Sequence, residues 1–136
     1  MYKVTKVINF SYGHRLLNYK GKCSNLHGHN GKVEIELFSE SLDKLGMVVD
    51  FDQIKNIIEE WIEENLDHKM LLSKDDPMVK ILKDNNEPVY VMETNPTAEA
   101  IAKLIYDFAV SKKLPVREVR FWETNNSFAV YNEKDK

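Results

Sequence analysis

The segment Lys32-Val33-Glu34-Ile35-Glu36-Leu37-Phe38 is the clearest guide to the fold, because its charged and apolar residues alternate from Lys32 to Leu37. This alternation predicts a β-strand with one face on a core and the other facing water or a polar cavity. Residues 2–10 alternate in the same way, so they predict an earlier strand that can pair with this one. The chain therefore opens with two candidate strands separated by a turn-rich loop.

Two helices are predicted downstream. Asp50 and Gln53 form a capping box that begins the first helix. Its buried stripe consists of apolar residues at helical spacing, namely Phe51, Ile54, Ile57, Ile58, Trp61 and Ile62. The second helix begins with Asn95 as its cap and Pro96 at its first helical position. Between the helices, residues 73–88 are polar and predict irregular structure, and residues 89–92 are a candidate edge strand.

Residues 116–124 and 128–131 predict two closing strands joined by a turn at 125–127. The resulting order, β-β-α-α-β-β, predicts an α+β fold with a four-stranded antiparallel sheet and two helices on one face. A length of 136 residues suggests one domain, 1–136. Two helices leave the other face and both sheet edges unprotected, and self-association is the usual remedy. We therefore expect a homo-oligomer.

Composition excludes several classes of partner. The formal net charge of −3 gives no general attraction to nucleic acid or to an anionic membrane. No segment approaches the ~20 apolar residues of a membrane span, and we expect a cytoplasmic protein. The single cysteine, Cys23, excludes an internal disulfide. A domain of this size can bury a core without a structural metal ion, so we expect any bound metal to have a catalytic role.

The histidines indicate a metal site. His27 and His29 flank Gly28, and residues two apart in extended backbone project to the same face. His14 follows the first predicted strand, so strand pairing would bring it alongside them. Three neutral imidazoles with one open position are typical of catalytic zinc. On spacing alone, the alternative is a His-x-His pair that is incidental polar surface.

A thiol and a further histidine are candidates for acid–base chemistry. Cys23 lies four residues before His27, and a nearby metal or histidine would lower the pKa of its thiol. His68 is the one histidine left over, and it could partner Cys23. Asp67 could orient the His68 imidazole if the backbone there is irregular, or it could be a helix cap or a surface charge. A cysteine without such neighbours is usually a small buried hydrophobe.

Glu123 ends the third predicted long strand and shares a face with Val119 and Phe121. A carboxylate there could accept paired hydrogen bonds from a ring N–H and an exocyclic amino group. The alternative is a strand-end glutamate in water.

Taken in order, six motifs resemble the family of 6-pyruvoyl-tetrahydropterin and 6-carboxy-tetrahydropterin synthases over nearly the whole chain. They are Gly13-His14-Arg15-Leu16, Cys23-x3-His27-Gly28-His29, Val49-Asp50-Phe51, Leu66-Asp67-His68, Asn95-Pro96-Thr97-Ala98-Glu99 and Glu123-Thr124. The resemblance implies a tunnelling fold (T-fold), in which trimers stack as hexamers and active sites lie between subunits. It implies these site residues: His14, His27 and His29 as zinc ligands; Cys23, Asp67 and His68 as the catalytic set; Glu123 as anchor of the pterin ring; Thr97 and Glu99 in the pocket wall.

Two features bear on the branch of the family. The three-residue spacing between Cys23 and His27 resembles the carboxy branch, whereas the ending from Glu123 to Tyr131 is similar to the pyruvoyl branch. The resemblance favours zinc-dependent conversion of 7,8-dihydroneopterin triphosphate to 6-carboxy-5,6,7,8-tetrahydropterin, with release of acetaldehyde and triphosphate, for queuosine and other deazapurines. The alternatives are a 6-pyruvoyl-tetrahydropterin synthase and a non-catalytic metal-binding assembly module. Arg15, Lys20 and Lys22 could meet the triphosphate or be solvated surface charges.

Overall fold

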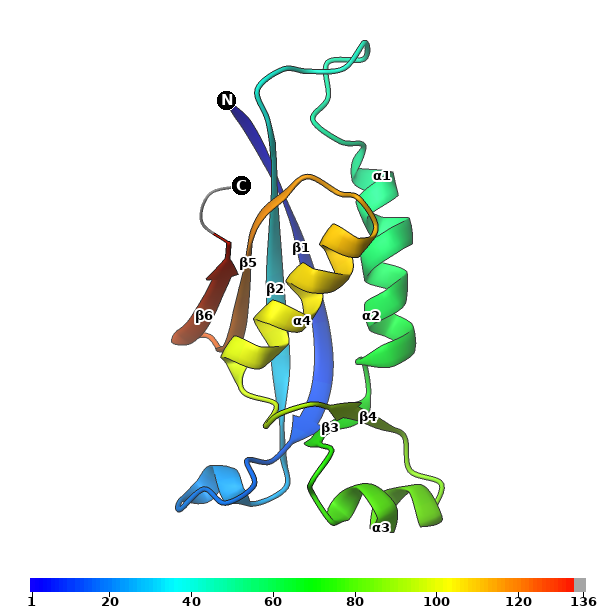
Figure 1. The fold of residues 1–136 in the computed structure, drawn as a ribbon, viewed down its shortest axis with the longest axis vertical. Coiled ribbons are helices and arrows are strands. Elements are labelled where there is room, and N and C mark those ends of the chain that lie inside the picture. The colour runs from blue at the N-terminus through cyan, green and yellow to red at the C-terminus, as the bar shows by residue number, and fades with distance from the viewer. Residues whose placement is uncertain (134–136) are drawn as a thin grey trace.

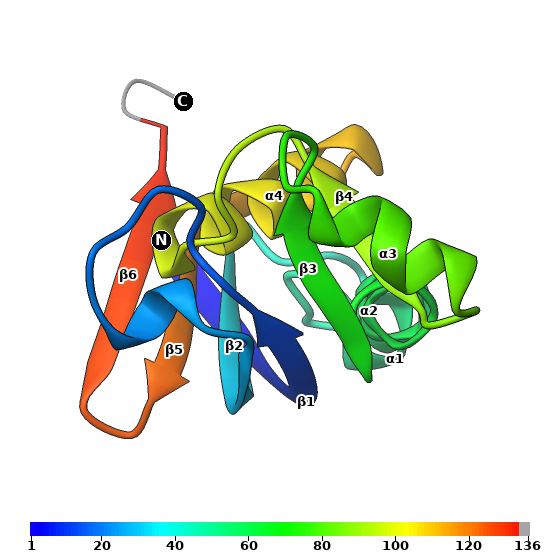
Figure 2. The ribbon, with the colours of Figure 1, turned by 90° about the horizontal axis from the view of Figure 1, so that it is seen from below.

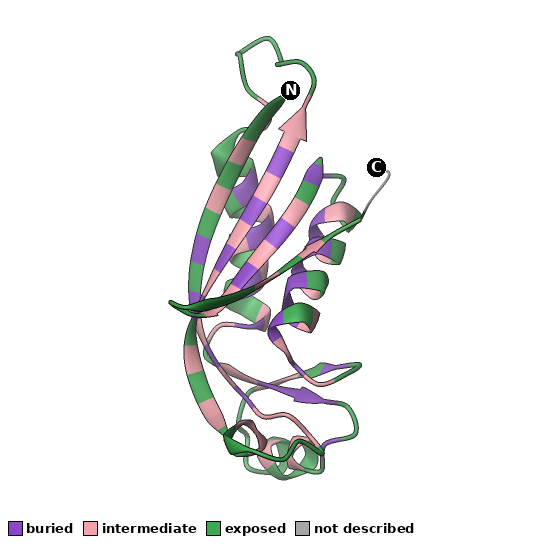
Figure 3. Ribbon diagram, turned by 90° about the vertical axis from the view of Figure 1, so that its left-hand side faces the viewer, coloured by how far each residue is buried: buried purple, intermediate pink, exposed green. Residues whose placement is uncertain are grey.

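The computed structural model describes residues 1–133, and a long antiparallel hairpin is its central feature. Strand β1 (Tyr2–His14) pairs with β2 (His27–Ser39) along its whole length, from Tyr2↔Ser39 to His14↔His27. Both strands are longer than predicted, and the added residues carry the pairing as far as the histidines. Figure 3 shows buried residues alternating with partly exposed ones along β2, as the sequence pattern requires.

Within residues 1–133, six strands form one mixed sheet in the order β4-β3-β1-β2-β5-β6. On one side of the hairpin, β5 (Val116–Thr124) and β6 (Ser127–Asn132) continue the antiparallel pairing. On the other side, β3 (Lys69–Ser73) and β4 (Val89–Met92) run parallel to β1 and to each other. Figure 2, seen from below, shows this order from β6 across to β3.

The prediction of α+β structure is confirmed, but the prediction of four antiparallel strands and two helices is wrong. The four predicted strands are present as β1, β2, β5 and β6, and the candidate strand at residues 89–92 is β4. Strand β3 and helix α3 (Met78–Asp84) are additional. Helix α3 lies in the region that was predicted to be irregular, between Pro77 and Pro88.

The remaining helices pack together on one face of the sheet (Figure 1). Helix α1 (Phe51–Ile54) leads through a π-helical segment (Lys55–Glu59) into α2 (Glu60–Asn65), and α4 (Ala98–Ser111) lies beside them. The buried stripe of the first pair is Ile54, Ile58 and Ile62. Phe51, predicted to belong to it, is 50% exposed.

Both predicted helix caps differ in detail from the structure. Asp50 caps α1 by accepting a hydrogen bond from Asp52 N, but within the described chain the Gln53 side chain accepts no hydrogen bond from Asp50 N. Helix α4 is capped by Thr97, whose hydroxyl accepts from Ala100 N at 3.1 Å, and not by Asn95. The true start of α4 is thus two residues later than predicted, which leaves Asn95 and Pro96 free for other contacts.

The hydrophobic core lies between the helices and the sheet face that carries Ile8, Val33, Ile35, Val119 and Phe121. That face becomes polar toward the lower end of the hairpin, where His14 is 1% exposed. Among residues 1–133, no helix has both the length and the apolar character that a membrane span requires.

Candidate metal centre

Three imidazoles converge at the lower end of the central hairpin. His14 ends β1 and lies directly opposite His27, the first residue of β2. His29 is two residues further along β2 and so shares a face with His27. The ring centroids of His14 and His27 are 4.6 Å apart, those of His14 and His29 5.1 Å, and those of His27 and His29 4.9 Å. Strand pairing and side-chain alternation therefore bring the three predicted ligands together.

Glu123, the penultimate residue of β5, adds a carboxylate to this cluster. Its Oε1 atom lies 3.2 Å from His14 Nε2 and 3.0 Å from His29 Nε2. One ligand atom from each of the four side chains lies within 4.8 Å of the others. Val119 and Phe121 on the same face of β5 are fully buried, so the carboxylate points to the core side, where the histidines are. The sequence pattern identified that face but not its contact with the histidines.

Backbone carbonyls fix the orientation of two of the rings. His14 Nδ1 lies 2.7 Å from Pro96 O, and His27 Nδ1 lies 2.6 Å from Asn25 O. A carbonyl only accepts, so each Nδ1 carries the hydrogen, and in the neutral ring Nε2 offers a lone pair to the cluster. Histidines that bind metals commonly donate their other N–H in this way.

Burial favours the neutral form of the rings. It lowers the pKa of His14 and of His29. This effect outweighs the opposite effects of the Pro96 hydrogen bond on His14 and of the Glu123 carboxylate on both rings. The distances to Glu123 are those of ion pairs, yet neither Nε2 has a partner with hydrogen-bond geometry among the described residues. For the neutral His14 ring, the approach is therefore a contact between two acceptors. The donor set of three imidazoles and a carboxylate fits a divalent transition metal such as zinc.

An amide latch holds the chain that follows His14. Asn95 Oδ1 accepts from Leu17 N at 2.8 Å, and Asn95 Nδ2 donates to Leu17 O at 3.0 Å. This pair of bonds ties the segment before α4 to the segment after β1. The latch thereby helps to keep the Pro96 carbonyl next to His14.

Tyr12 forms part of the wall of the cluster. Its ring lies edge-on to His14, with centroids 5.1 Å apart, and its hydroxyl is buried without a hydrogen-bond partner in the described chain. Burial and the Glu123 carboxylate raise the pKa of Tyr12, so the phenol stays protonated. Gly31 makes this packing possible, because a Cβ there would lie 2.8 Å from the Phe121 ring. Tyr12 is not among the site residues predicted from the sequence.

Arg15 is engaged in a structural ion pair. Its Nε and Nη2 atoms donate to the two carboxylate oxygens of Asp76 at 2.7 and 2.5 Å, and the Asp76 side chain is fully buried. Asp76 Oδ1 also accepts from Met78 N at the start of α3. The bond from Arg15 lowers the pKa of Asp76. Arg15 is therefore a partnered, partly buried charge and not a solvated surface charge.

Asp67 and His68 contact each other through an irregular backbone. His68 has a φ of 59°, in the left-handed region, and its Nδ1 lies 2.9 Å from Asp67 Oδ2. Asp67 Oδ1 accepts from Ser11 N at 2.9 Å, which fixes the carboxylate against β1. The backbone irregularity needed for Asp67 to orient the imidazole is present. The His68 side chain is 80% exposed.

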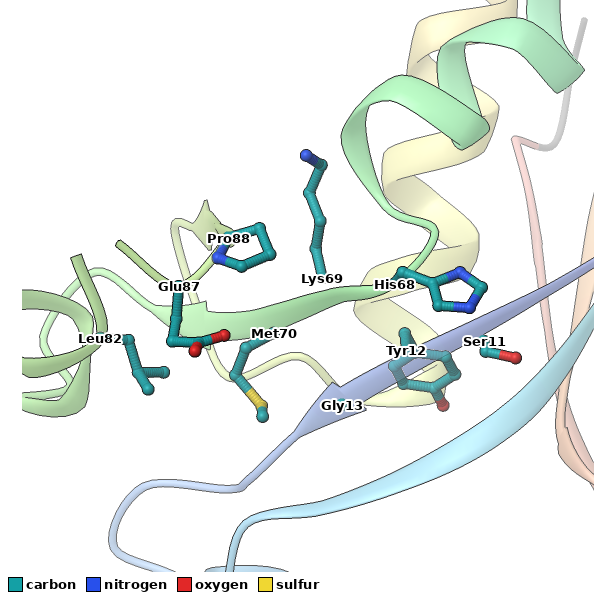
Figure 4. A pocket seen from close by; sticks show the side chains of 9 residues that line it. All are labelled: Ser11, Tyr12, Gly13, His68, Lys69, Met70, Leu82, Glu87 and Pro88. Atoms are coloured by element: carbon teal, nitrogen blue, oxygen red, sulfur yellow. The ribbon is translucent and has the colours of Figure 1, made fainter. Parts of the chain in front are cut away.

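His68 lines a pocket of 480 Å³ beside β1 (Figure 4). The pocket runs from Ser11 and His68 toward Met70, with Leu82 and Glu87 at its far end. It lies on the β3 side of β1.

Cys23 lies elsewhere. It is half-buried in a short 3₁₀ turn, Lys22–Ser24, and its carbonyl accepts from Leu16 N at 2.8 Å. Its loop extends to the opposite side of β1 from β3, as both Figure 1 and Figure 2 show. Within residues 1–133, Cys23 has no hydrogen bond to Asp67 or His68. One chain alone does not bring the predicted catalytic set together.

Thr97 and Glu99 lie at the start of α4, just after the segment that contacts His14. Thr97 follows Pro96, whose carbonyl contacts His14, and its hydroxyl caps the helix. Glu99 is exposed in the first helical turn.

Fold and site together define an α+β protein with a histidine cluster suited to a metal at one end of a mixed sheet. Residues 3–134 match the family model of 6-pyruvoyl tetrahydropterin synthase. The chain belongs to this family.

Relatives from both branches of the family are similar to the chain. A 6-carboxy-5,6,7,8-tetrahydropterin synthase from Rickettsia typhi is 38% identical, over 94% of this chain and 98% of its own length. A 6-pyruvoyl tetrahydrobiopterin synthase from Pongo abelii is 35% identical, over 95% of this chain and 90% of its own. The solved Caenorhabditis elegans 6-pyruvoyl tetrahydropterin synthase shares the fold, with a TM-score of 0.74 and 23% identity over 98% of this chain and 96% of that one.

Proposed function

We propose that the protein is a zinc-dependent lyase that converts 7,8-dihydroneopterin triphosphate to 6-carboxy-5,6,7,8-tetrahydropterin, releasing acetaldehyde and triphosphate. The observation that carries the proposal is the convergence of His14, His27 and His29 in a member of the tetrahydropterin synthase family. The 38% identity to a 6-carboxy-tetrahydropterin synthase and the short spacing between Cys23 and His27 favour this branch. The product would enter queuosine and other deazapurine synthesis.

The three histidines would hold the metal through Nε2, with His14 and His27 oriented by the carbonyls of Pro96 and Asn25. When bound, zinc would stabilise negative charge that develops on the substrate oxygens. Glu123 would accept hydrogen bonds from the pterin ring, and Thr97 and Glu99 would line the pocket beside it. The position of Glu123 next to the histidines supports this arrangement. A substrate whose pterin ring binds Glu123 would have its own side chain close to the metal.

Proton transfer would fall to Cys23 and His68. Asp67 holds His68 by one carboxylate oxygen while Ser11 N holds the other, so the imidazole has a defined orientation. Because Cys23 and His68 lie on opposite sides of β1, the complete set would form where two copies of the chain meet. We therefore propose an oligomer, a hexamer built from two trimers. A catalytic thiol also suits the cytoplasm, where thiols stay reduced.

Product analysis tests the reaction. Purified zinc-loaded protein is incubated with dihydroneopterin triphosphate, and acetaldehyde, triphosphate and the pterin product are measured. We expect acetaldehyde and triphosphate in equal amounts. Triphosphate without acetaldehyde would support the 6-pyruvoyl branch, which the relative from Pongo abelii represents. Metal content without any turnover would support a non-catalytic metal-binding module.

A variant separates the role of Cys23 from metal binding. Cys23→Ala should abolish turnover while zinc remains bound, because Cys23 is not among the clustered ligand residues. Full activity of this variant would show that the thiol is not catalytic.

A further inference from the structure

The carboxylate of Glu123 lies where the three imidazoles converge, within 3.2 Å of His14 Nε2 and 3.0 Å of His29 Nε2. Both nitrogens are buried, and neither has a hydrogen-bond partner within residues 1–133. No lysine or arginine in this part of the chain forms an ion pair with Glu123; its ion-pair contacts are the two histidines.

The contact between Glu123 and His14 does not have hydrogen-bond geometry. His14 Nδ1 donates to Pro96 O at 2.7 Å, so the neutral ring has no hydrogen on Nε2. A nitrogen lone pair then faces a carboxylate oxygen in a buried place, which is repulsive in the absence of positive charge. A cation shared between the two atoms removes the repulsion.

The spacing of the donor atoms fits such a cation. Tetrahedral zinc with bonds of ~2.0–2.1 Å places neighbouring donor atoms about 3.3 Å apart. The two distances from Glu123, 3.2 and 3.0 Å, are close to this value. His27, whose Nδ1 donates to Asn25 O, supplies the remaining nitrogen within the same 4.8 Å group. Three imidazoles and one carboxylate oxygen complete a set of four.

We propose that Glu123 is the fourth protein ligand of the metal in the substrate-free protein, and that pterin and metal compete for its carboxylate. This inference rests on the proposed function, which assigns the same carboxylate to the pterin ring. Under this proposal, binding of the pterin ring opens a coordination position on the metal, because a ring that binds Glu123 takes that ligand away from the metal. The metal is closed to other ligands until a pterin arrives.

Metal affinity tests the first half of the proposal. The zinc dissociation constants of the wild-type protein and of Glu123→Gln are measured by competition with a chromophoric chelator. Loss of a supporting residue around a metal site commonly weakens binding 10–100-fold, so loss of a direct ligand should weaken it by at least about tenfold. Glu118→Gln is the matched control, since Glu118 is on the same strand and pairs with Arg120 instead. It should bind zinc like the wild type.

Equal zinc affinity of Glu123→Gln and the wild type would overturn the proposal but leave the proposed function standing, because three histidines would still hold the metal. Thermal unfolding of the metal-free variants shows whether a loss of affinity reflects a loss of folding. Similar unfolding temperatures with weaker binding support direct ligation, and Glu123→Asp, which keeps the charge, should bind zinc more tightly than Glu123→Gln.

Cobalt substitution tests the competition. The visible absorption of Co²⁺-loaded protein reports the ligand set, and neopterin serves as a probe that has the ring but no triphosphate. Neopterin should change the spectrum of the Co²⁺-loaded wild type. Co²⁺-loaded Glu123→Gln should differ from the Co²⁺-loaded wild type even without neopterin. A wild-type spectrum unchanged by neopterin, at concentrations where neopterin fluorescence shows binding, would overturn the competition. Neither measurement depends on turnover.

Discussion

Single side chains fix the geometry of the metal centre through bonds to distant backbone. His14 is oriented by the carbonyl of Pro96, 82 residues further along the chain, and Asn95 ties the same segment to Leu17. The three histidines themselves were predictable, because strand pairing and two-residue alternation determine where they point. The Pro96 and Asn95 contacts were not, since no local pattern encodes a hydrogen bond over such a separation.

Asn95→Ala should weaken zinc binding although Asn95 does not touch the metal. Without the latch, the Pro96 carbonyl is less firmly placed, and His14 loses part of its orientation. We expect zinc affinity to fall about tenfold, as for other supporting residues of metal sites. Chelator competition measures it. Asn85→Ala is the control, because the Asn85 amide also donates to a backbone carbonyl but at the exposed end of α3. Wild-type affinity in Asn95→Ala would contradict the prediction.

Asp76 should make stability sensitive to acid. Its pKa is lowered, chiefly by the hydrogen bonds from Arg15, relative to an unfolded value of about 3.9. The stabilisation is therefore complete above about pH 4 and is lost as the pH falls through the lowered pKa, since the unfolded chain then binds more protons.

Asp76→Asn should cost about 2 kcal/mol at pH 7, the scale of hydrogen bonds to charged groups. Its stability should also change less between pH 4 and pH 2 than that of the wild type. Urea unfolding at a series of pH values measures both effects. Asp75→Asn, one residue away and exposed, should behave like the wild type. An unchanged pH profile in Asp76→Asn would show that the ion pair contributes nothing to acid sensitivity.

The sequence predicted the strands in which buried and exposed residues alternate, and it missed a strand and a helix that lack such a pattern. Strands β1 and β2 have one buried and one open face, and their pattern is clear. Strand β3 has Leu71, Leu72 and Ser73 all buried, so no alternation marks it. Helix α3 has no buried residue, and thus no apolar stripe. Neither element can be predicted from a contrast between a buried and an exposed face, because neither has one.

The start of α4 shows a second limit of local patterns. Asn95 and Thr97 are both good caps, and the sequence favoured the earlier one because Pro96 suits a first helical position. The structure uses Thr97, since the Asn95 amide is engaged by Leu17. Thr97→Ala should therefore destabilise the protein by about 1 kcal/mol, and Thr97→Ser should recover most of the loss. Urea unfolding measures both, and equal stability of the Ala and Ser variants would exclude the cap as the cause.

The sheet has two open strand edges whose directions suit antiparallel pairing between copies of the chain. Strand β1 pairs with β3 only at residues 12–14, so within the described chain its second edge is free from Tyr2 to Phe10. Among the described residues, strand β6 pairs only with β5. Antiparallel order across β1, β2, β5 and β6 makes β6 run opposite to β1. The β6 strand of one copy can therefore continue the sheet antiparallel to β1 of the next. Repeated contacts of this head-to-tail kind form a ring when the rotation between copies closes, and the proposed trimer requires such closure.

Blocking one edge should dissociate this assembly. Val7 on β1 and Val130 on β6 are 45% and 42% exposed, and both lie on the face away from the core, where a seam between copies would cover them. Lysine is a residue that keeps sheet edges apart, so Val130→Lys should shift the protein toward single chains of 15.9 kDa. Ile81→Lys on α3, at a site 50% exposed and away from both edges, should keep the wild-type mass. Light scattering coupled to gel filtration measures the masses, and a wild-type protein that elutes as a single chain would refute pairing of the edges.

If the edges do pair, the single-chain variant should also lose turnover while retaining zinc, because Cys23 and His68 would no longer meet across the seam.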